Sequence, residues 1–161
     1  MLRSMNRQPN IILINCDDLG WGDPGCYGHP RNATPYIDKM ASEGIRVTDF
    51  YMASPVCSPS RGAMMTGCYP ARIGFDTFEG KLVLFPGQKV GLSSGETTIA
   101  EILRDSGYVT KIIGKWHCGD QPEFLPTNHG FDEYYGIPYS NDMGRQIGGE
   151  NKWPPLPLLR D

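Results

Sequence analysis

The chain has 161 residues, of which 39% are hydrophobic and 11% aromatic, an ordinary composition for a globular protein. This composition excludes a wholly disordered chain and a collagen-like repeat. A net charge of −3, without any run of Lys or Arg, argues against nucleic acid or an anionic membrane surface as a partner.

The cysteines and the N-terminus limit the class of protein further. The five cysteines contain no Cys-x-x-Cys pair, so a structural zinc site is not expected, and their odd number leaves at least one thiol free. No apolar run reaches transmembrane length, and the first ten residues lack the apolar core of a signal peptide. An exported protein whose leader had been removed would look the same, so the sequence leaves the location open.

The first predicted element is a short apolar run at residues 11–14, typical of a strand buried on both faces of a parallel sheet. Asp17 and Asp18 follow it. Adjacent carboxylates repel each other and resist desolvation, so one interpretation is a compensating cation, and oxygen ligands favour Ca²⁺ or Mg²⁺. The alternative is a solvated turn before Gly20, and the local sequence does not decide between them.

A helix and a strand are expected next. After a glycine-rich loop at residues 19–31, Thr34 as N-cap and Pro35 at the first helical position predict a helix that closes at Gly44. Residues 45–51 alternate between apolar and polar side chains, as a strand does.

A second helix is predicted around Cys57. Ser58 is a good N-cap, and Pro59 suits the first helical position of a helix that ends near Gly67. Cys57 would then lie at a helix N-terminus, where the helix dipole favours anions and lowers a thiol pKa, and Arg61 would add a positive charge. The alternative is an ordinary buried cysteine beside a turn.

The rest of the chain mixes irregular and regular segments. Residues 69–95 give no periodic signal apart from a short strand at 82–85, and no function is assigned to them. Thr98 and Glu101 form a capping-box pattern for a helix that Gly107 stops, and a strand follows at residues 108–113. The Pro-rich segment 153–159 is expected to lie extended over the domain, with a loop on the substrate side as the alternative.

This strand–helix–strand alternation predicts an α/β fold with a parallel sheet, whose ligands bind at the carboxyl ends of the strands. The polar groups that follow candidate strands are Asp17, Asp18, Cys57, Lys115 and His117. In an extended chain Lys115 and His117 would point to the same side. Positive charges that face a metal indicate a small oxyanion substrate, either a sulfate or a phosphate ester.

Six ordered motifs from Pro9 onward resemble those of a known family. CSPSR at 57–61 is similar to the CxPxR signature of the sulfatases, in which the cysteine is oxidised to formylglycine. The other matching segments are NIILINCDDLGWGDPGCYGHP, TPYIDKMASEGIRVTDFY, TGCYPARIG, GKWHCG and GFDEYYGIPYSND. The chain most resembles the type I sulfatases of the arylsulfatase A and N-acetylgalactosamine-6-sulfatase kind.

The resemblance implies a fold and a domain organisation. The fold is an alkaline-phosphatase-like, mostly parallel sheet flanked by helices, incomplete in this chain. Residues 1–9 would be a tail and residues 10–161 the N-terminal part of the catalytic domain, because the family's later calcium ligands, second histidine, second lysine and C-terminal domain have no counterpart here.

The resemblance also implies residue roles. Asp17 and Asp18 match calcium ligands, and Cys57 matches the formylglycine precursor, which also faces the metal. Arg61 matches the arginine that steadies the aldehyde hydrate. The residues that match contacts to the hydrate or the sulfate are Lys115, His117 and Ser140.

In the implied mechanism one hydroxyl of the aldehyde hydrate attacks sulfur and releases the alcohol. The second hydroxyl is then deprotonated, which expels the sulfate and restores the aldehyde. Calcium is favoured over magnesium as the metal. The partners implied are an aryl or carbohydrate sulfate and the formylglycine-generating enzyme that would act on CSPSR. Cys118 replaces the family's usual leucine, a change expected to affect packing only.

Several alternatives remain open from the sequence. With only two protein carboxylates for the metal, we expect the 161 residues alone to be inactive or nearly so. A phosphonate or phosphate ester hydrolase of the same superfamily, a catalytically dead fragment, and a thiol hydrolase that uses Cys57 and His117 directly are the competing readings. The last of these leaves Asp17 and Asp18 unexplained.

Overall fold

The computed structural model describes residues 8–145 and 153–161, so most of the predicted tail at 1–9 lies outside the described residues. The chain divides into two compact units, Met1–Phe50 (unit 1) and Tyr51–Asp161 (unit 2). The helices are α1 Pro35–Glu43, α2 Cys57–Thr66 and α3 Ile99–Asp105, and the strands are β1 Lys111–Lys115, β2 Glu133–Ile137 and β3 Leu159–Arg160. Short 3₁₀ helices cover Gly25–Tyr27, Pro70–Ile73, Pro122–Phe124, Pro126–His129 and Asn141–Met143. No helix in the described part of the chain is long and apolar enough to cross a membrane.

In unit 1, helix α1 confirms the helix predicted from Thr34, Pro35 and Gly44. Thr34 takes the predicted N-cap position but makes no side-chain capping bond, because its hydroxyl donates to Asp38 Oδ1 (2.8 Å) and accepts a hydrogen bond from the Gly25 amide (2.8 Å). The Cys26 amide also donates to Asp38 Oδ1 (2.7 Å). These bonds attach α1 to the 3₁₀ helix of the glycine-rich loop.

The strands predicted at residues 11–14 and 45–51 are wrong for this structure. Neither segment is a strand, and the four apolar side chains at 11–14 are between 52% and 83% exposed. A strand forms only when a neighbouring strand accepts and donates its backbone hydrogen bonds, and neither segment has such a neighbour among the described residues. The strand predicted at 82–85 is absent for the same reason.

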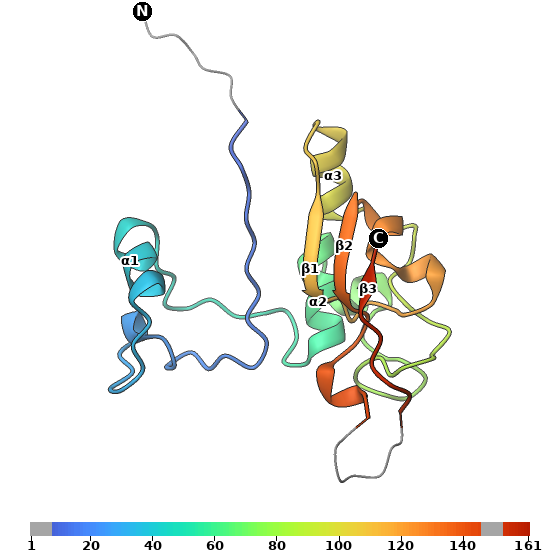
Figure 1. Cartoon of the computed structure of the whole chain (residues 1–161), viewed down its shortest axis with the longest axis horizontal. Coiled ribbons are helices and arrows are strands. Elements are labelled where there is room, and N and C mark those ends of the chain that lie inside the picture. Colours follow the sequence, from blue (N-terminus) through green and yellow to red (C-terminus); the bar gives the residue numbers. More distant parts are fainter. Residues whose placement is uncertain (1–7, 146–152) are drawn as a thin grey trace, which may run out of the picture. The chain divides into compact units, whose positions relative to one another are not determined.

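Unit 2 contains a mixed sheet with the strand order β1-β2-β3, seen side by side in Figure 1. β1 and β2 run parallel, with Lys111 opposite Glu133 and Lys115 opposite Ile137, while β3 is antiparallel to β2. The strand expected at 108–113 therefore begins and ends later than predicted. The α/β class is confirmed.

Two glycines allow β1 and β2 to approach closely. Gly114 faces Gly136 in the register and has φ +107, a conformation that L side chains rarely adopt. A Cβ atom on Gly136 would lie 1.9 Å from the Gly114 carbonyl oxygen, far inside contact distance. Both positions therefore require glycine.

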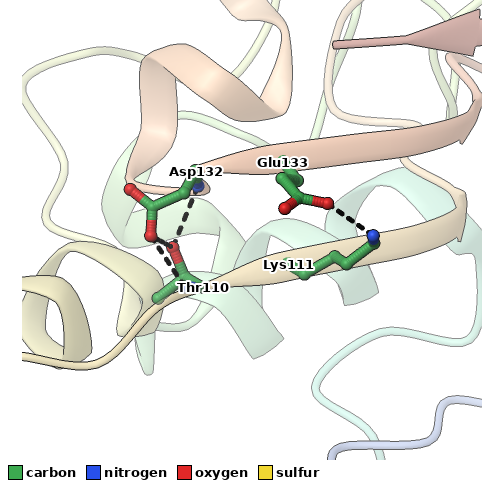
Figure 2. Close-up of polar contacts among 4 residues, drawn as sticks. All are labelled: Thr110, Lys111, Asp132 and Glu133. Carbon is green, nitrogen blue, oxygen red and sulfur yellow. Dashed lines mark hydrogen bonds and ion pairs between the residues drawn. The ribbon is translucent and has the colours of Figure 1, made fainter.

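Polar groups join the beginnings of β1 and β2, as Figure 2 shows. Asp132 Oδ2 accepts hydrogen bonds from the Thr110 amide (2.8 Å) and hydroxyl (3.0 Å). These bonds, the one from the amide first, hold the pKa of the Asp132 carboxyl below its usual value. One residue further along, Lys111 Nζ lies 2.5 Å from Glu133 Oε2 in an exposed ion pair.

The irregular segment 69–95 supplies much of the core of unit 2. Its buried side chains Phe75, Phe78, Leu84 and Leu92 form one cluster with other buried side chains, those of Met65, Trp116, Cys118 and Tyr134. The segment was correctly predicted to be irregular, and its contribution is packing.

Helix α3 has the predicted capping box. Thr98 Oγ1 accepts a hydrogen bond from the Glu101 amide (3.2 Å), and Glu101 Oε2 accepts one from the Thr98 amide (2.7 Å). The Thr98 hydroxyl donates to the His129 carbonyl (2.7 Å), which attaches the helix to the loop before β2.

The Pro-rich segment 153–159 packs along the rest of unit 2, as expected. The Trp153 ring stacks on Phe85 with 5.3 Å between ring centroids, and the chain then enters β3. The segment is therefore packed and hydrogen-bonded against the unit.

Candidate active site

Cys57 is the first residue of helix α2, and Val56 with extended dihedral angles takes the N-cap position. The prediction that Ser58 caps this helix is wrong. Ser58 is fully buried, and its Oγ accepts a hydrogen bond from the Leu84 amide (3.0 Å), so the hydroxyl reaches another segment instead of its own helix. The helix ends as predicted at Gly67, which has φ 68.

Arg61 lies one turn after Cys57 and connects α2 to the sheet. Its side chain is buried with the residue 9% exposed, and Nη1 donates to the Lys115 carbonyl (2.5 Å) at the end of β1. Arg61 and Cys57 also both act electrostatically on Cys118, so these three residues share one local environment. A fixed positive charge therefore lies close to the first turn of α2.

Lys115 and Ser140 come together at the carboxyl end of the two parallel strands. Lys115 is the last residue of β1, and its Nζ lies 3.2 Å from Ser140 Oγ. Ser140 follows β2 and is the N-cap of the 3₁₀ helix Asn141–Met143. Adjacent parallel strands place these side chains at the edge where ligands bind in α/β sheets.

His117 is fully buried beside this edge. Its Nε2 lies 2.9 Å from the Leu84 carbonyl oxygen, and its amide donates to the Pro138 carbonyl (2.9 Å). The argument that Lys115 and His117 share a side assumed an extended backbone. His117 has φ +59, in the left-handed region, so that alternation does not apply to it.

His117 also lines a small pocket on unit 2 with Asp120 and Tyr139; its other lining residues are Leu84, Phe85, Val90, Gly119 and Pro138. Burial and, to a smaller extent, the negative charge of Asp120 raise the pKa of Tyr139. The Tyr139 hydroxyl is therefore held in its neutral form.

One residue of this neighbourhood, Leu84, was not predicted from the sequence. Leu84 contributes through its backbone, and no side-chain motif signals such a role. Cys118 is fully buried in the core cluster, and burial raises the pKa of its thiol, with the packing role expected for it.

Asp17 and Asp18 lie in unit 1, and both are exposed; Asp18 has φ 58. Across residues 8–145 and 153–161, no group of three or more His, Cys, Asp or Glu side chains is placed to hold a metal ion. Calcium takes about six to eight oxygen ligands. Asp17 and Asp18 as calcium ligands therefore remain a prediction.

Comparison with known proteins identifies relatives over nearly the whole chain. A family model described as Sulfatase matches residues 9–154. Human arylsulfatase A is 51% identical over 140 residues, which cover 86% of this chain and 27% of that protein. Human N-acetylgalactosamine-6-sulfatase is 48% identical over 133 residues, 81% of this chain and 26% of that protein. The chain thus spans about a quarter of the length of these relatives.

Solved structures agree with these matches. The crystal structure of Ps i-CgsB has a TM-score of 0.78 at 42% identity, over 83% of this chain and 29% of that one, and this protein has also been crystallised with k-i-k-neocarrahexaose. The PsFucS1 sulfatase from Pseudoalteromonas sp. has a TM-score of 0.74 at 41% identity, over 84% of this chain and 27% of that one.

Proposed function

This chain belongs to the sulfatase family, and we propose that it serves the hydrolysis of sulfate esters, with Cys57 as the residue around which the chemistry is built. Residues 10–161 would form the N-terminal part of the catalytic domain. The observation that supports the proposal is the pair of hydrogen bonds that join Arg61 to Lys115 and Lys115 to Ser140 at the end of β1, with Arg61 and Cys57 both acting electrostatically on Cys118.

The charges of this set suit an oxyanion. The Lys115 ammonium and the Ser140 hydroxyl lie within hydrogen-bonding distance of each other, so both can reach one sulfate group. The first turn of α2 offers backbone N–H groups and the positive end of a ten-residue helix beside Cys57. The buried Arg61 guanidinium adds a positive charge to that environment.

We propose that Cys57 is oxidised to formylglycine by a formylglycine-generating enzyme that acts on CSPSR. The aldehyde hydrate would supply a hydroxyl nucleophile and an internal route for expelling sulfate, which an ordinary serine ester lacks. Around it, Arg61 would hold the position of the first turn, and Lys115 with Ser140 would bind sulfate oxygens. His117 would also contact the sulfate group of the substrate.

A divalent cation, calcium rather than magnesium, is the metal we propose for Asp17 and Asp18, with Cys57 facing it after modification. The described donors fall short of a full ligand set, so no step of the reaction is assigned to the metal here. For the same reason we expect little or no turnover of an aryl sulfate by the 161 residues alone. Measurable turnover by the modified chain would contradict this expectation.

The substrate class we propose is an aryl or carbohydrate sulfate. Relatives are named arylsulfatase A and N-acetylgalactosamine-6-sulfatase, and a structural neighbour was crystallised with a neocarrahexaose. Steady-state assays that compare kcat/KM for matched aryl sulfate and aryl phosphonate substrates, carried out on the full-length protein, separate the proposal from a phosphonate ester hydrolase. A higher kcat/KM for the phosphonate would favour that alternative.

The modification is tested directly by mass spectrometry. The chain is co-expressed with a formylglycine-generating enzyme, and the tryptic peptide that ends at Arg61 is analysed for the aldehyde. We expect the aldehyde in the wild type and in Cys68→Ala, which removes a cysteine just beyond the other end of α2, and its absence in Cys57→Ala. An unmodified Cys57 in this host would favour a catalytically dead product.

A further inference from the structure

A single backbone residue connects the first turn of α2 to His117. The Leu84 amide donates to Ser58 Oγ (3.0 Å), and the Leu84 carbonyl oxygen lies 2.9 Å from His117 Nε2. All three residues are buried, with Ser58 and His117 at 0% and Leu84 at 3% exposure. The two hydrogen bonds therefore form a water-excluded connection from the neighbour of Cys57 to His117.

We propose that Ser58 is a positioning residue that acts through the backbone of Leu84 to fix the ring orientation and tautomer of His117. The inference rests on the proposed function only for the part His117 plays toward a sulfate ester. The connection between Ser58, Leu84 and His117 is a property of unit 2 and can be measured without any turnover.

The chemistry of the acceptor fixes which nitrogen carries the proton. A peptide carbonyl oxygen can only accept, so His117 Nε2 must donate, and the neutral ring then has its lone pair on Nδ1. The Leu84 amide is held by Ser58 Oγ, and this amide and the Leu84 carbonyl belong to adjacent peptide groups that share the Leu84 Cα atom, so fixing one restricts the position of the other. Loss of the Ser58 hydroxyl therefore removes one of the bonds that hold the carbonyl in place for His117.

Packing explains why a backbone group can serve this purpose. The Leu84 side chain is part of the core cluster with Trp116 and Tyr134, so its main chain is anchored on the side opposite to solvent. A segment without regular secondary structure normally leaves its peptide groups to water, whereas this one has both of its polar atoms bonded inside the unit. Ser58 Oγ accepts the hydrogen bond of the buried Leu84 amide and therefore does not cap its own helix.

The test is nitrogen-15 NMR of the imidazoles in the unmodified 161-residue chain, which contains only three histidines. We expect the Nε2-protonated tautomer for His117 in the wild type. In Ser58→Ala we expect the Leu84 amide and the His117 Nε2 proton to exchange with solvent about fivefold to tenfold faster, the effect of losing one hydrogen bond, and a second tautomer to be populated. The Nδ1-protonated tautomer in the wild type would overturn the proposal even if the variant did not fold.

Control measurements separate positioning from general loss of stability. Thr66→Ala removes a hydroxyl from the same helix, where it donates to the Gly62 carbonyl (2.8 Å) and accepts from the Cys68 amide (3.3 Å), and should leave His117 unchanged. The Leu92 amide, bonded to the Cys118 carbonyl (2.8 Å), serves as the internal reference for global opening. Equal acceleration at Leu92, or a His117 signal unaltered in Ser58→Ala, would refute the inference. Ser58→Thr retains the hydroxyl and should restore the wild-type tautomer; a tautomer mixture like that of Ser58→Ala would count against it.

Discussion

His129 gives the chain a stability that depends on pH near neutrality. The residue is fully buried at the end of the 3₁₀ helix Pro126–His129, and its ring lies 5.8 Å from that of Trp116. Neither ring nitrogen has a hydrogen-bond partner in the described part of the chain. Burial lowers the pKa of His129 below its ordinary 6.5, and the negative charge of Glu101 opposes this only in part.

The sign and size of the effect follow from linkage. Because the folded pKa is lower than the unfolded one, the unfolded chain binds more protons between the folded pKa and pH 6.5. Folding free energy is therefore lost as the pH falls below 6.5, by at most about 1.4 kcal/mol per pH unit for one proton. His129→Leu removes both the titration and the two unbonded nitrogens, so its stability relative to the wild type should increase as the pH falls.

The assay is urea unfolding between about pH 5 and pH 8, the range in which a histidine titrates. Trp21→Phe and Trp153→Phe in all variants leave Trp116 as the fluorescent reporter beside His129. Asn128→Ala, in the same 3₁₀ helix, is the control and should keep the wild-type pH dependence. A stability difference between wild type and His129→Leu that stays constant across this range would show that His129 is not the group responsible.

Three further predictions concern stability and reactivity. Gly136→Ala should cost about 3 kcal/mol or more in urea unfolding, because its Cβ meets backbone at 1.9 Å, whereas Gly95→Ala, with its nearest atom at 3.4 Å, should be nearly neutral. The Cys118 thiol should resist alkylation in the folded chain, because burial raises its pKa, while urea should make it reactive. Thr110→Val should raise the Asp132 pKa toward 3.8, measurable by carboxyl NMR, and so reduce the stability that this carboxylate provides above that pH and that is lost as the pH falls. Rapid labelling of the native Cys118, or an unchanged Asp132 titration, would contradict the last two.

The helices could be read from local sequence because their signals are local. Pro35 begins α1, Thr98 and Glu101 cap α3, and Gly67 ends α2 in the left-handed conformation. Each of these signals acts within one turn of the residue that carries it, so no distant part of the chain is needed to interpret it. The exception, Ser58, shows that a good capping residue is used elsewhere when a buried amide competes for its oxygen.

The strands were harder because a strand depends on its neighbours. Residues 111–115 form β1 with β2 as a partner, while the more apolar residues 11–14 remain exposed and have no partner strand among the described residues. Periodicity reports which side chains could be buried and says nothing of whether a partner strand is present. The close Gly114–Gly136 contact, which depends on register, was likewise not predictable from either segment alone.

The predicted site shows the same difference between local signals and contacts that depend on the fold. Arg61, Lys115 and Ser140 came from motifs of polar side chains, and hydrogen bonds join Arg61 to Lys115 and Lys115 to Ser140 in the structure. No motif predicted a role for Leu84, because the side chain of an apolar residue in an irregular segment indicates packing only. Its amide and carbonyl nevertheless meet Ser58 and His117, and its side chain holds that peptide in the core. The packing of the irregular segment therefore determines part of the geometry around His117. A substitution in the core of this unit can alter the orientation of His117 although no polar residue is replaced.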